Sequence, residues 1–404
     1  MIGGIVLIFI TAGLAAALIS RLKQRHLNLD TGFLWNLFFF HLALAFVYYL
    51  YATFNPSDSI GYYKTITNDF LGNSWGNYYG TSTTFIRFVG YPFIKFLGFS
   101  YEAMMVLFSF FGFIGFAFFY LFFKENIHFK HKFFGVNLFT LIFFLPNLHF
   151  WSSSFGKGSI ILMGIGLFMY SLRHLQRRWV EVLVGGFIIY HVRPHIMLMI
   201  LMSSAIGFVF STRGISMPLK VLFLAGVTVA FFFIYKDVLA LVGIDEEQFL
   251  SQGLDLTHRA TELTKSTSGV DITSYSLPMQ VFTFLFRPLF IDAPGVLGLI
   301  VSFENVFYLI MAAKLFNFSA LRYLITGNFL VKTSLMSFIT VSIALAQISG
   351  NLGLAIRQKS QVMLLFLFVI LSFLDSRKLE EYHRAERQRK RKLKLQVTDP
   401  VKAT

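Results

Sequence analysis

The chain has 404 residues, of which 56% are hydrophobic and only 14% are charged. With a mean hydropathy of +0.66, this composition excludes an ordinary soluble domain and favours a membrane protein with several spans. The absence of cysteine excludes disulfides, thiolate metal sites and a cysteine nucleophile. A net charge of +15 is typical of nucleic-acid binders, but the distribution of the cations favours a membrane topology signal instead.

Apolar stretches close to the length of a membrane-spanning helix recur along the whole chain. The eleven candidate spans are 2–20, 32–51, 101–123, 133–150, 159–172, 180–190, 196–210, 219–241, 294–315, 329–348 and 361–374. The first begins without a basic region and lacks a small-residue cleavage site, so we expect a retained span rather than a signal peptide. The predicted fold is an all-α polytopic membrane protein with about eleven transmembrane helices, several of them short or broken.

Basic residues favour the cytoplasmic side in short loops, and this rule predicts the orientation. Basic segments at 21–25, 124–132, 173–178, 213–220 and 314–332 fall on one side if the N-terminus lies outside. We therefore expect residues 1–374 to form one transmembrane domain and residues 375–404 to form a basic cytoplasmic tail that binds anionic lipid. The loops near 52–100, 151–158, 191–195, 243–293 and 350–360 would then lie outside, and the first of them contains an amphipathic stretch from Phe85 to Phe99.

The segment His191-Val192-Arg193-Pro194-His195 interrupts the apolar stretch 180–210. An arginine at membrane depth costs from about 3 to over 10 kcal/mol, so its presence there usually indicates function. The alternative is a short connector at the membrane face. The two flanking spans are short, and they could cross only beside a water-filled recess or as a re-entrant segment.

Cations occur in four outer segments that are far apart in the sequence. They are Lys157, Arg193, Arg287, Arg357 and Lys359. Cations at one depth favour an anion site, and arginine binds phosphate oxygens with two parallel hydrogen bonds. A lipid-linked pyrophosphate is the large phosphorylated ligand that this surface would meet. The alternative is that these side chains simply reach toward lipid headgroups.

Asp58 is the outstanding carboxylate of the first outer loop, where it is a candidate general base or a helix cap. His195 is a second candidate acid or base, whereas His191 is expected to be structural. Tyr62, Tyr63 and Trp151 could stack on sugar rings or belong to an ordinary aromatic belt. Glu304, inside a span, has to pair or be protonated. The sequence contains no HExxH, GxSxG or CxxC motif, and we expect no metal and no cofactor.

Five segments together resemble two related families of bacterial membrane proteins. They are the Asp58 loop, Trp151-Ser-Ser-Ser-Phe-Gly-Lys157, Arg193-Pro194-His195, Phe286-Arg287-Pro288 with Asp292-Ala293, and Asn351-Leu-Gly353 with Arg357. The pattern is similar to the GT-C-type glycosyltransferases and the O-antigen-polymerase-like proteins of surface polysaccharide clusters.

The resemblance implies sugar transfer from a polyprenyl-phosphate or pyrophosphate donor at the outer face of the bacterial plasma membrane. It further implies that Asp58 is the base and that Arg193, Arg287, Arg357 and His195 bind the lipid diphosphate and assist transfer. Expected partners are the polyprenyl-phosphate-linked saccharide, membrane lipids and other polysaccharide-assembly proteins, but no nucleic acid. Two alternatives stay open, namely a transporter or flippase of lipid-linked glycans and a non-catalytic membrane scaffold.

Overall fold

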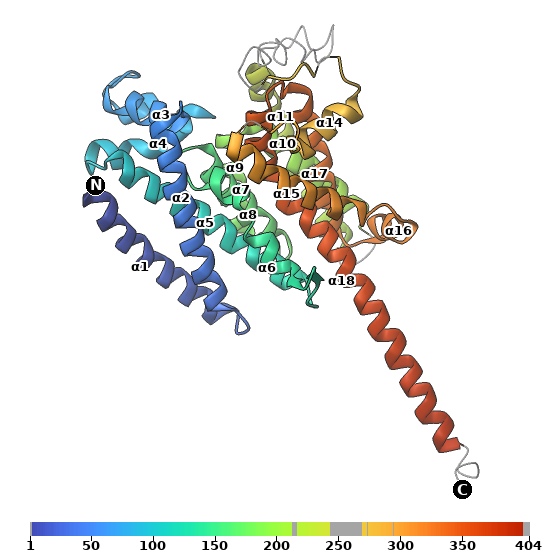
Figure 1. The fold of residues 1–404 in the computed structure, drawn as a ribbon. Helices are drawn as coiled ribbons and strands as arrows, with labels where there is room; N and C mark the ends of the chain where they lie inside the picture. Colours follow the sequence, from blue (N-terminus) through green and yellow to red (C-terminus); the bar gives the residue numbers. More distant parts are fainter. Residues whose placement is uncertain (1, 212–215, 243–268, 273, 294, 399–404) are drawn as a thin grey trace.

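The computed structural model describes residues 2–211, 216–242, 269–272, 274–293 and 295–398. The described part is almost entirely helical (Figure 1). The first half comprises α1 (Ile2–Arg25), α2 (Thr31–Phe54), α3 (Asp58–Thr67), the short helix η1 (Trp75–Tyr78), α4 (Thr83–Tyr91), the π-turn η2 (Pro92–Phe96), α5 (Tyr101–Asn126), the two-residue strands β1 (Lys132–Phe133) and β2 (Val136–Asn137), α6 (Leu138–Phe143), α7 (Pro146–Ser152) and α8 (Lys157–Leu172). The strands pair as one antiparallel hairpin.

The second half continues with helices alone. They are α9 (Trp179–Val192), α10 (Pro194–Val209), α11 (Met217–Val242), α14 (Leu277–Phe286), α15 (Gly295–Ala313), α16 (Phe318–Thr326), α17 (Phe329–Ile348) and α18 (Leu352–Thr398). Much of the predicted outer loop 243–293, namely residues 243–268, lies outside the described residues.

Five described helices are long and apolar enough to cross a membrane. They are Gly3–Arg25, Thr31–Phe54, Tyr101–Asn126, Gly295–Ala313 and Phe329–Ile348. Shorter apolar helical stretches of 10–17 residues also occur, and they include both helices that flank Arg193. The helical character and the membrane type of the chain therefore agree with the prediction, while the count of eleven spans stays a prediction.

Two prolines begin new helices, and one of them lies inside an expected span. The candidate span 133–150 is divided into α6 and α7, because Pro146 opens α7 at a position where its missing N–H costs nothing. Pro194 does the same for α10, so that α9 ends at Val192 and Arg193 lies between the two helices. The predicted interruption at Arg193 is thus present in the fold.

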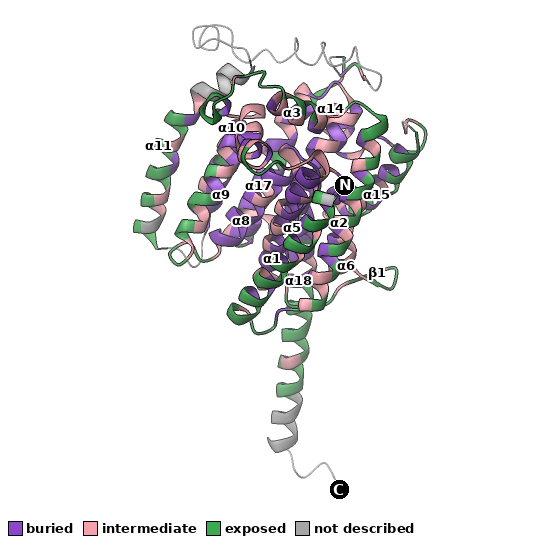
Figure 2. Cartoon of the chain, turned by 90° about the vertical axis from the view of Figure 1, so that its left-hand side faces the viewer, coloured by how far each residue is buried: buried purple, intermediate pink, exposed green. Residues whose placement is uncertain are grey.

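The core lies where α5 packs against α8. A Cβ added to Gly115 of α5 would lie 2.7 Å from the backbone carbon of Leu162, and one added to Gly166 would lie 2.6 Å from the Gly115 carbonyl oxygen. Only glycine allows the two backbones to approach this closely. Figure 2 shows the buried residues gathered around α5, α8 and α17, and an exposed end of α18. The predicted boundary at residue 375 falls inside α18, so the span and the basic tail form one continuous helix.

The two ends of the bundle differ in chemistry. At one end Glu125 binds Arg178 at 2.7 Å and lies 3.8 Å from His26, which brings three of the basic turns between helices together. The opposite end carries α3, α4 and α14 and is called the α3 end below (Figures 1 and 2). The candidate site lies there.

Candidate functional site

An ion pair between Asp58 and Arg357 is the centre of the site. The Arg357 guanidinium donates a 2.5 Å hydrogen bond to the Asp58 carboxylate, although the two residues are 299 positions apart. The Asp58 side chain is 54% exposed and that of Arg357 is 20% exposed. The carboxylate is therefore accessible from the surroundings, whereas the cation beneath it is held by the protein.

The start of α3 holds Asp58 in place. Ser57 caps the helix by accepting a hydrogen bond from the Ser59 backbone N–H, and Asp58 is the first helical residue. The Ser57 hydroxyl is hydrogen-bonded to the Tyr48 hydroxyl at 3.0 Å and to the Ser59 hydroxyl at 2.7 Å. The Ser59 hydroxyl is in turn hydrogen-bonded to the Tyr101 hydroxyl at 2.7 Å. The cap itself is therefore Ser57, which leaves the Asp58 carboxylate free of that structural task.

Two of the predicted aromatic residues surround this pair. The Arg357 guanidinium lies 6.0 Å from the Trp151 ring centre, within the range of a cation–π contact. The Tyr62 phenol lies close enough to Asp58 and Arg357 to interact electrostatically with both. Burial raises the pKa of the Tyr62 phenol and the Asp58 charge adds to the rise, so this hydroxyl remains protonated at neutral pH and can donate.

Lys157 and the Arg193 break are joined by Ser82. The Lys157 ammonium donates to the Ser82 hydroxyl at 2.9 Å, and the Ser82 backbone N–H donates to the His191 carbonyl oxygen at 2.6 Å. Ser82 has φ 62, a conformation that is unfavourable for a residue with a side chain. Such strained positions cost about 1–3 kcal/mol and often occur at functional sites. Lys157, Ser82 and His191 therefore meet at one point, and Arg193 follows His191 by two residues.

Tyr62 links this point to the ion pair. A Cβ added to Gly156, directly before Lys157, would lie 3.9 Å from the Tyr62 ring. On the other side Arg87 lies 5.7 Å from the centre of the same ring. Asp58, Tyr62, Trp151, Arg357, Arg87 and Lys157 are called the Asp58 site below. One carboxylate and two cations, Arg357 and Arg87, thus lie near one buried phenol, and Lys157 begins the helix that follows Gly156.

Arg287 belongs to a neighbouring loop with its own partner. Its guanidinium donates at 2.5 Å to Asp292, whose second oxygen accepts at 2.5 Å from the Leu289 backbone N–H. The side chain is half-buried, at 20% exposure. The described contacts therefore give Arg287 the role of closing the turn between α14 and α15.

Lys359, one of the predicted phosphate-binding residues, is buried inside the protein. Its ammonium is fully buried and donates to the oxygens of Asn305, Arg287 and Leu285 at 2.6, 3.1 and 3.2 Å. An ammonium has three N–H donors, and three acceptors surround this one. These contacts indicate that Lys359 positions the Arg287 loop against α15 and α18, and they differ from the predicted phosphate contact.

The remaining predicted residues are also placed. Tyr63 points away from the pair and donates to the Phe99 carbonyl at 3.1 Å, which indicates a packing role. His191 is buried, with Tyr79 at 3.1 Å and the Phe187 carbonyl at 2.9 Å, as expected of a structural histidine. His195 is half-buried in the first turn of α10. Glu304 accepts from the Asn147 N–H at 2.7 Å, so it is paired with another helix.

Arg87 and Ser82 are the residues that sequence reasoning missed. Arg87 is the only cation between 81 and 94, and it lies in an amphipathic stretch where a single charge has an ordinary explanation. Ser82 carried no sequence signal at all, because its role comes from backbone contacts.

Among the residues that the structure describes, no group of three His, Asp or Glu side chains could hold a metal ion. The site is instead built from an exposed carboxylate, cations and aromatic rings, which suits an anionic ligand with hydroxyl groups. The chain matches no family model, no curated protein and no solved structure.

Proposed function

We propose that this protein is a membrane glycosyltransferase or polysaccharide polymerase, which transfers sugar from a polyprenyl-phosphate or pyrophosphate-linked donor. The α3 end would face the outside of a bacterial plasma membrane. The observation that carries the proposal is the meeting of Asp58 and Tyr62 from α3 with Arg357 from α18, near the Lys157–Ser82 contact, at one end of an apolar bundle. A carboxylate beside cations suits a reaction in which a proton is removed and a phosphate departs.

The transfer would proceed by substitution at the anomeric carbon of the donor sugar. The acceptor hydroxyl oxygen forms the new bond to this carbon while the bond to the phosphate oxygen breaks, and the lipid phosphate leaves with the electron pair. Asp58 takes the proton of the acceptor hydroxyl. Arg357 and Lys157 stabilise the charge that grows on the departing phosphate, and Arg193 is proposed to assist them.

The ion pair between Asp58 and Arg357 would have to open during this reaction. A phosphate arriving at Arg357 competes with Asp58 for the same guanidinium donors. The pair observed here would then exchange for an arginine–phosphate pair, and the carboxylate would be released toward the acceptor. Trp151 and Tyr62 supply aromatic and hydroxyl contacts to the sugar, while the basic end of α18 binds anionic lipid or other assembly proteins.

The direct test uses the purified protein in lipid nanodiscs. The probe is the radiolabelled lipid-linked saccharide fraction extracted from the source cells. We expect label to move from the lipid fraction to a longer or water-soluble glycan only when the protein is added. Label that stays on its original lipid, with protein that is folded and monodisperse, would contradict the proposal.

The proposed orientation can be tested directly because the chain contains no cysteine. Ser74→Cys, in the loop before η1, should react with a membrane-impermeant maleimide on intact cells. Glu381→Cys, on the exposed part of α18, should react only after the membrane is opened. Both positions are exposed. The opposite labelling pattern would place the Asp58 site inside and remove the proposed location.

A flippase of lipid-linked glycans is the second candidate, and one buried cluster favours it. Glu304 and Lys359 lie buried among helices with Asn305 and Tyr308, an arrangement that a carrier could use to couple transport to protons.

Glu304→Gln separates the two candidates, since glutamine can still accept from the Asn147 N–H. For an enzyme we expect transfer within about threefold of the wild type, whereas loss of the titratable group should abolish proton-coupled movement. The measurement compares sugar transfer with translocation of a fluorescent lipid-linked saccharide in proteoliposomes. The flippase would be favoured if the wild type translocates the lipid-linked saccharide but transfers no sugar, and Glu304→Gln no longer translocates it.

A further inference from the structure

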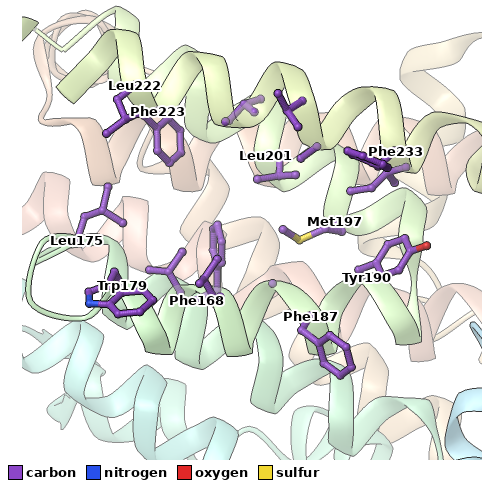
Figure 3. Close-up of a pocket in the computed structure, with 18 of the residues that line it drawn as sticks. Phe168, Leu175, Trp179, Phe187, Tyr190, Met197, Leu201, Leu222, Phe223 and Phe233 are labelled. Carbon is purple, nitrogen blue, oxygen red and sulfur yellow. The ribbon is translucent and has the colours of Figure 1, made fainter. Parts of the chain in front are cut away.

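Many exposed apolar side chains lie on apolar helices, where membrane lipid can cover them. Figure 3 shows one case, in which Leu222 and Phe233 of α11 line an apolar cavity of about 1060 Å³ while being 70% and 76% exposed. Phe96 and Leu97 are 66% and 63% exposed as well, but they lie at the end of η2, in the connection between α4 and α5. Their exposure therefore needs an explanation of its own.

Trp75 extends this exposed surface. Its ring centre lies 6.3 Å from that of Phe96, and its side chain is 41% exposed. The indole stacks on Phe88 at 4.9 Å, and its N–H donates to the Phe88 carbonyl oxygen at 2.8 Å. The only polar atom of the indole is thus satisfied within the protein, so the ring can enter an apolar layer without losing a hydrogen bond. Trp75, Phe96 and Leu97 are called the apolar patch below.

The course of the chain places the apolar patch at the membrane surface. The apolar helix α5 begins at Tyr101, four residues after Leu97, and four residues reach at most about 14 Å. With 26 residues, α5 is about 39 Å long, which exceeds the hydrocarbon thickness of about 30 Å. Its ends therefore reach the headgroup region, and the apolar patch lies close to one of them.

Two other candidate spans have residues at the same level. Tyr49 of α2 donates to Glu102 at 3.3 Å, and a Cβ added to Gly4 of α1 would lie 3.2 Å from the Glu102 Cβ. The helix α3 is held there too, since the Tyr63 hydroxyl donates to the Phe99 carbonyl oxygen at 3.1 Å. The segment between α2 and α5 is therefore attached to the bundle where its apolar helices end.

We infer that the apolar patch inserts into the membrane next to the lipid headgroups and anchors the segment between α2 and α5 to the bilayer. The patch exposes roughly 300–400 Å², at about 200 Å² for each large side chain, whereas each partner of a stable protein complex buries about 800 Å². Tryptophan, phenylalanine and leucine beside a span are typical of the membrane interface. Lipid therefore fits this surface better than a protein partner does.

Such an anchor would fix the depth of the Asp58 site. Asp58 and Tyr63 lie on one helix of ten residues, which is about 15 Å long. Because Tyr63 is bound to the connection that carries the patch, the Asp58 carboxylate would stay within reach of the headgroup region. The inference concerns the position of the segment and does not depend on the proposed reaction.

The absence of cysteine allows one spin label at a time to be placed in the full-length protein. Leu97→Cys and, independently, Phe96→Cys carry the label in nanodiscs of equal parts phosphatidylcholine and phosphatidylglycerol. Phe9→Cys, 74% exposed on α1, is the control in lipid, and Glu381→Cys, on the exposed part of α18, is the control in water. Power-saturation EPR compares collisions of each label with oxygen, which concentrates in lipid, and with a water-soluble nickel chelate.

At both patch positions we expect a ratio of oxygen to nickel collisions at least about fivefold above that of Glu381→Cys and below that of Phe9→Cys, because interfacial anchors lie only about 5–10 Å deep. Adding Phe96→Ser to the Leu97→Cys protein should lower the ratio at least about twofold, because the patch loses one of its two aromatic rings. Phe96 is exposed, so this change should not unfold the segment.

Two results would overturn the inference. One is a ratio at both patch positions as low as that of Glu381→Cys, since the patch would then face water. The other is protection of both positions from oxygen and from the nickel chelate, since protein would then cover the patch, whether a second copy of this chain or another subunit. Neither result depends on whether the protein transfers sugar, so the anchor and the proposed function fail separately.

Discussion

Asp58→Asn is expected to lower the rate of sugar transfer by about 10²- to 10⁴-fold, the usual contribution of a general base. Asparagine preserves the size and the hydrogen-bonding oxygen of aspartate but cannot accept a proton from the acceptor hydroxyl. The measurement is the initial rate of label transfer in nanodiscs at saturating donor. Binding of the donor should not weaken, because the carboxylate acts on the acceptor and its loss removes a competitor of the phosphate for Arg357.

The stability of the protein should survive this substitution. The Asp58 side chain is 54% exposed, and asparagine keeps a side-chain oxygen that can accept the hydrogen bond of Arg357. The N-cap hydrogen bond of α3 comes from Ser57 and is retained. Thermal unfolding of the variant should therefore resemble that of the wild type, and lost transfer can be attributed to the site.

Asp69→Asn is the matched control for this experiment. Asp69 lies just after α3, is paired with Lys95 at 2.8 Å and is also exposed. Its φ of 53 is tolerated by asparagine, so the backbone should not change. Transfer by Asp69→Asn should stay within about twofold of the wild type. Equal activity of the two variants would remove Asp58 from the role of base.

Local sequence rules predicted much of this fold. The composition predicted an all-helical membrane protein, and Arg193 before Pro194 predicted the break between α9 and α10 because both residues oppose a continuous apolar helix. Pro146 gives the same local signal within the candidate span 133–150, but the continuous apolar stretch around it favours a single helix. The change from apolar to charged residues near 375 predicts a boundary between span and tail, but nothing in that sequence ends a helix, and α18 continues through it. The end of a membrane span is therefore hardest to predict where the residues change from apolar to charged but still favour a helix.

The contacts of the site could be predicted only in part. The positions of Asp58 and Arg357 in loops on one predicted side allowed them to meet, but their pairing across 299 residues depends on how α3 lies on α18. Lys359, only two residues away, points to the other side of α18 and binds Asn305. The sequence alone does not show which of the two cations faces Asp58 and which is buried against Asn305, because helix packing sets the direction of each side chain.

Arg357→Ala is expected to lower transfer by about 10²- to 10³-fold, comparable to removing one donor from a preformed oxyanion site. Unlike the Asp58 variant, it should weaken donor binding as well, because the guanidinium contacts the phosphate before and during the reaction. Arg357→Lys retains the charge but loses the planar pair of donors, so a smaller loss of about tenfold is expected. Rates at several donor concentrations separate binding from the chemical step.

The double variant Asp58→Asn with Arg357→Ala tests whether the two residues act as one unit. If Arg357 both holds Asp58 in the resting state and binds the departing phosphate, the two losses should not add, and the double variant should be little slower than the worse single variant. Arg377→Ala, on the exposed part of α18, keeps the loss of one arginine but lies away from the site and should transfer at the wild-type rate. Fully additive losses, or equal losses in Arg377→Ala, would mean that Arg357 acts through general charge rather than through its contact with Asp58.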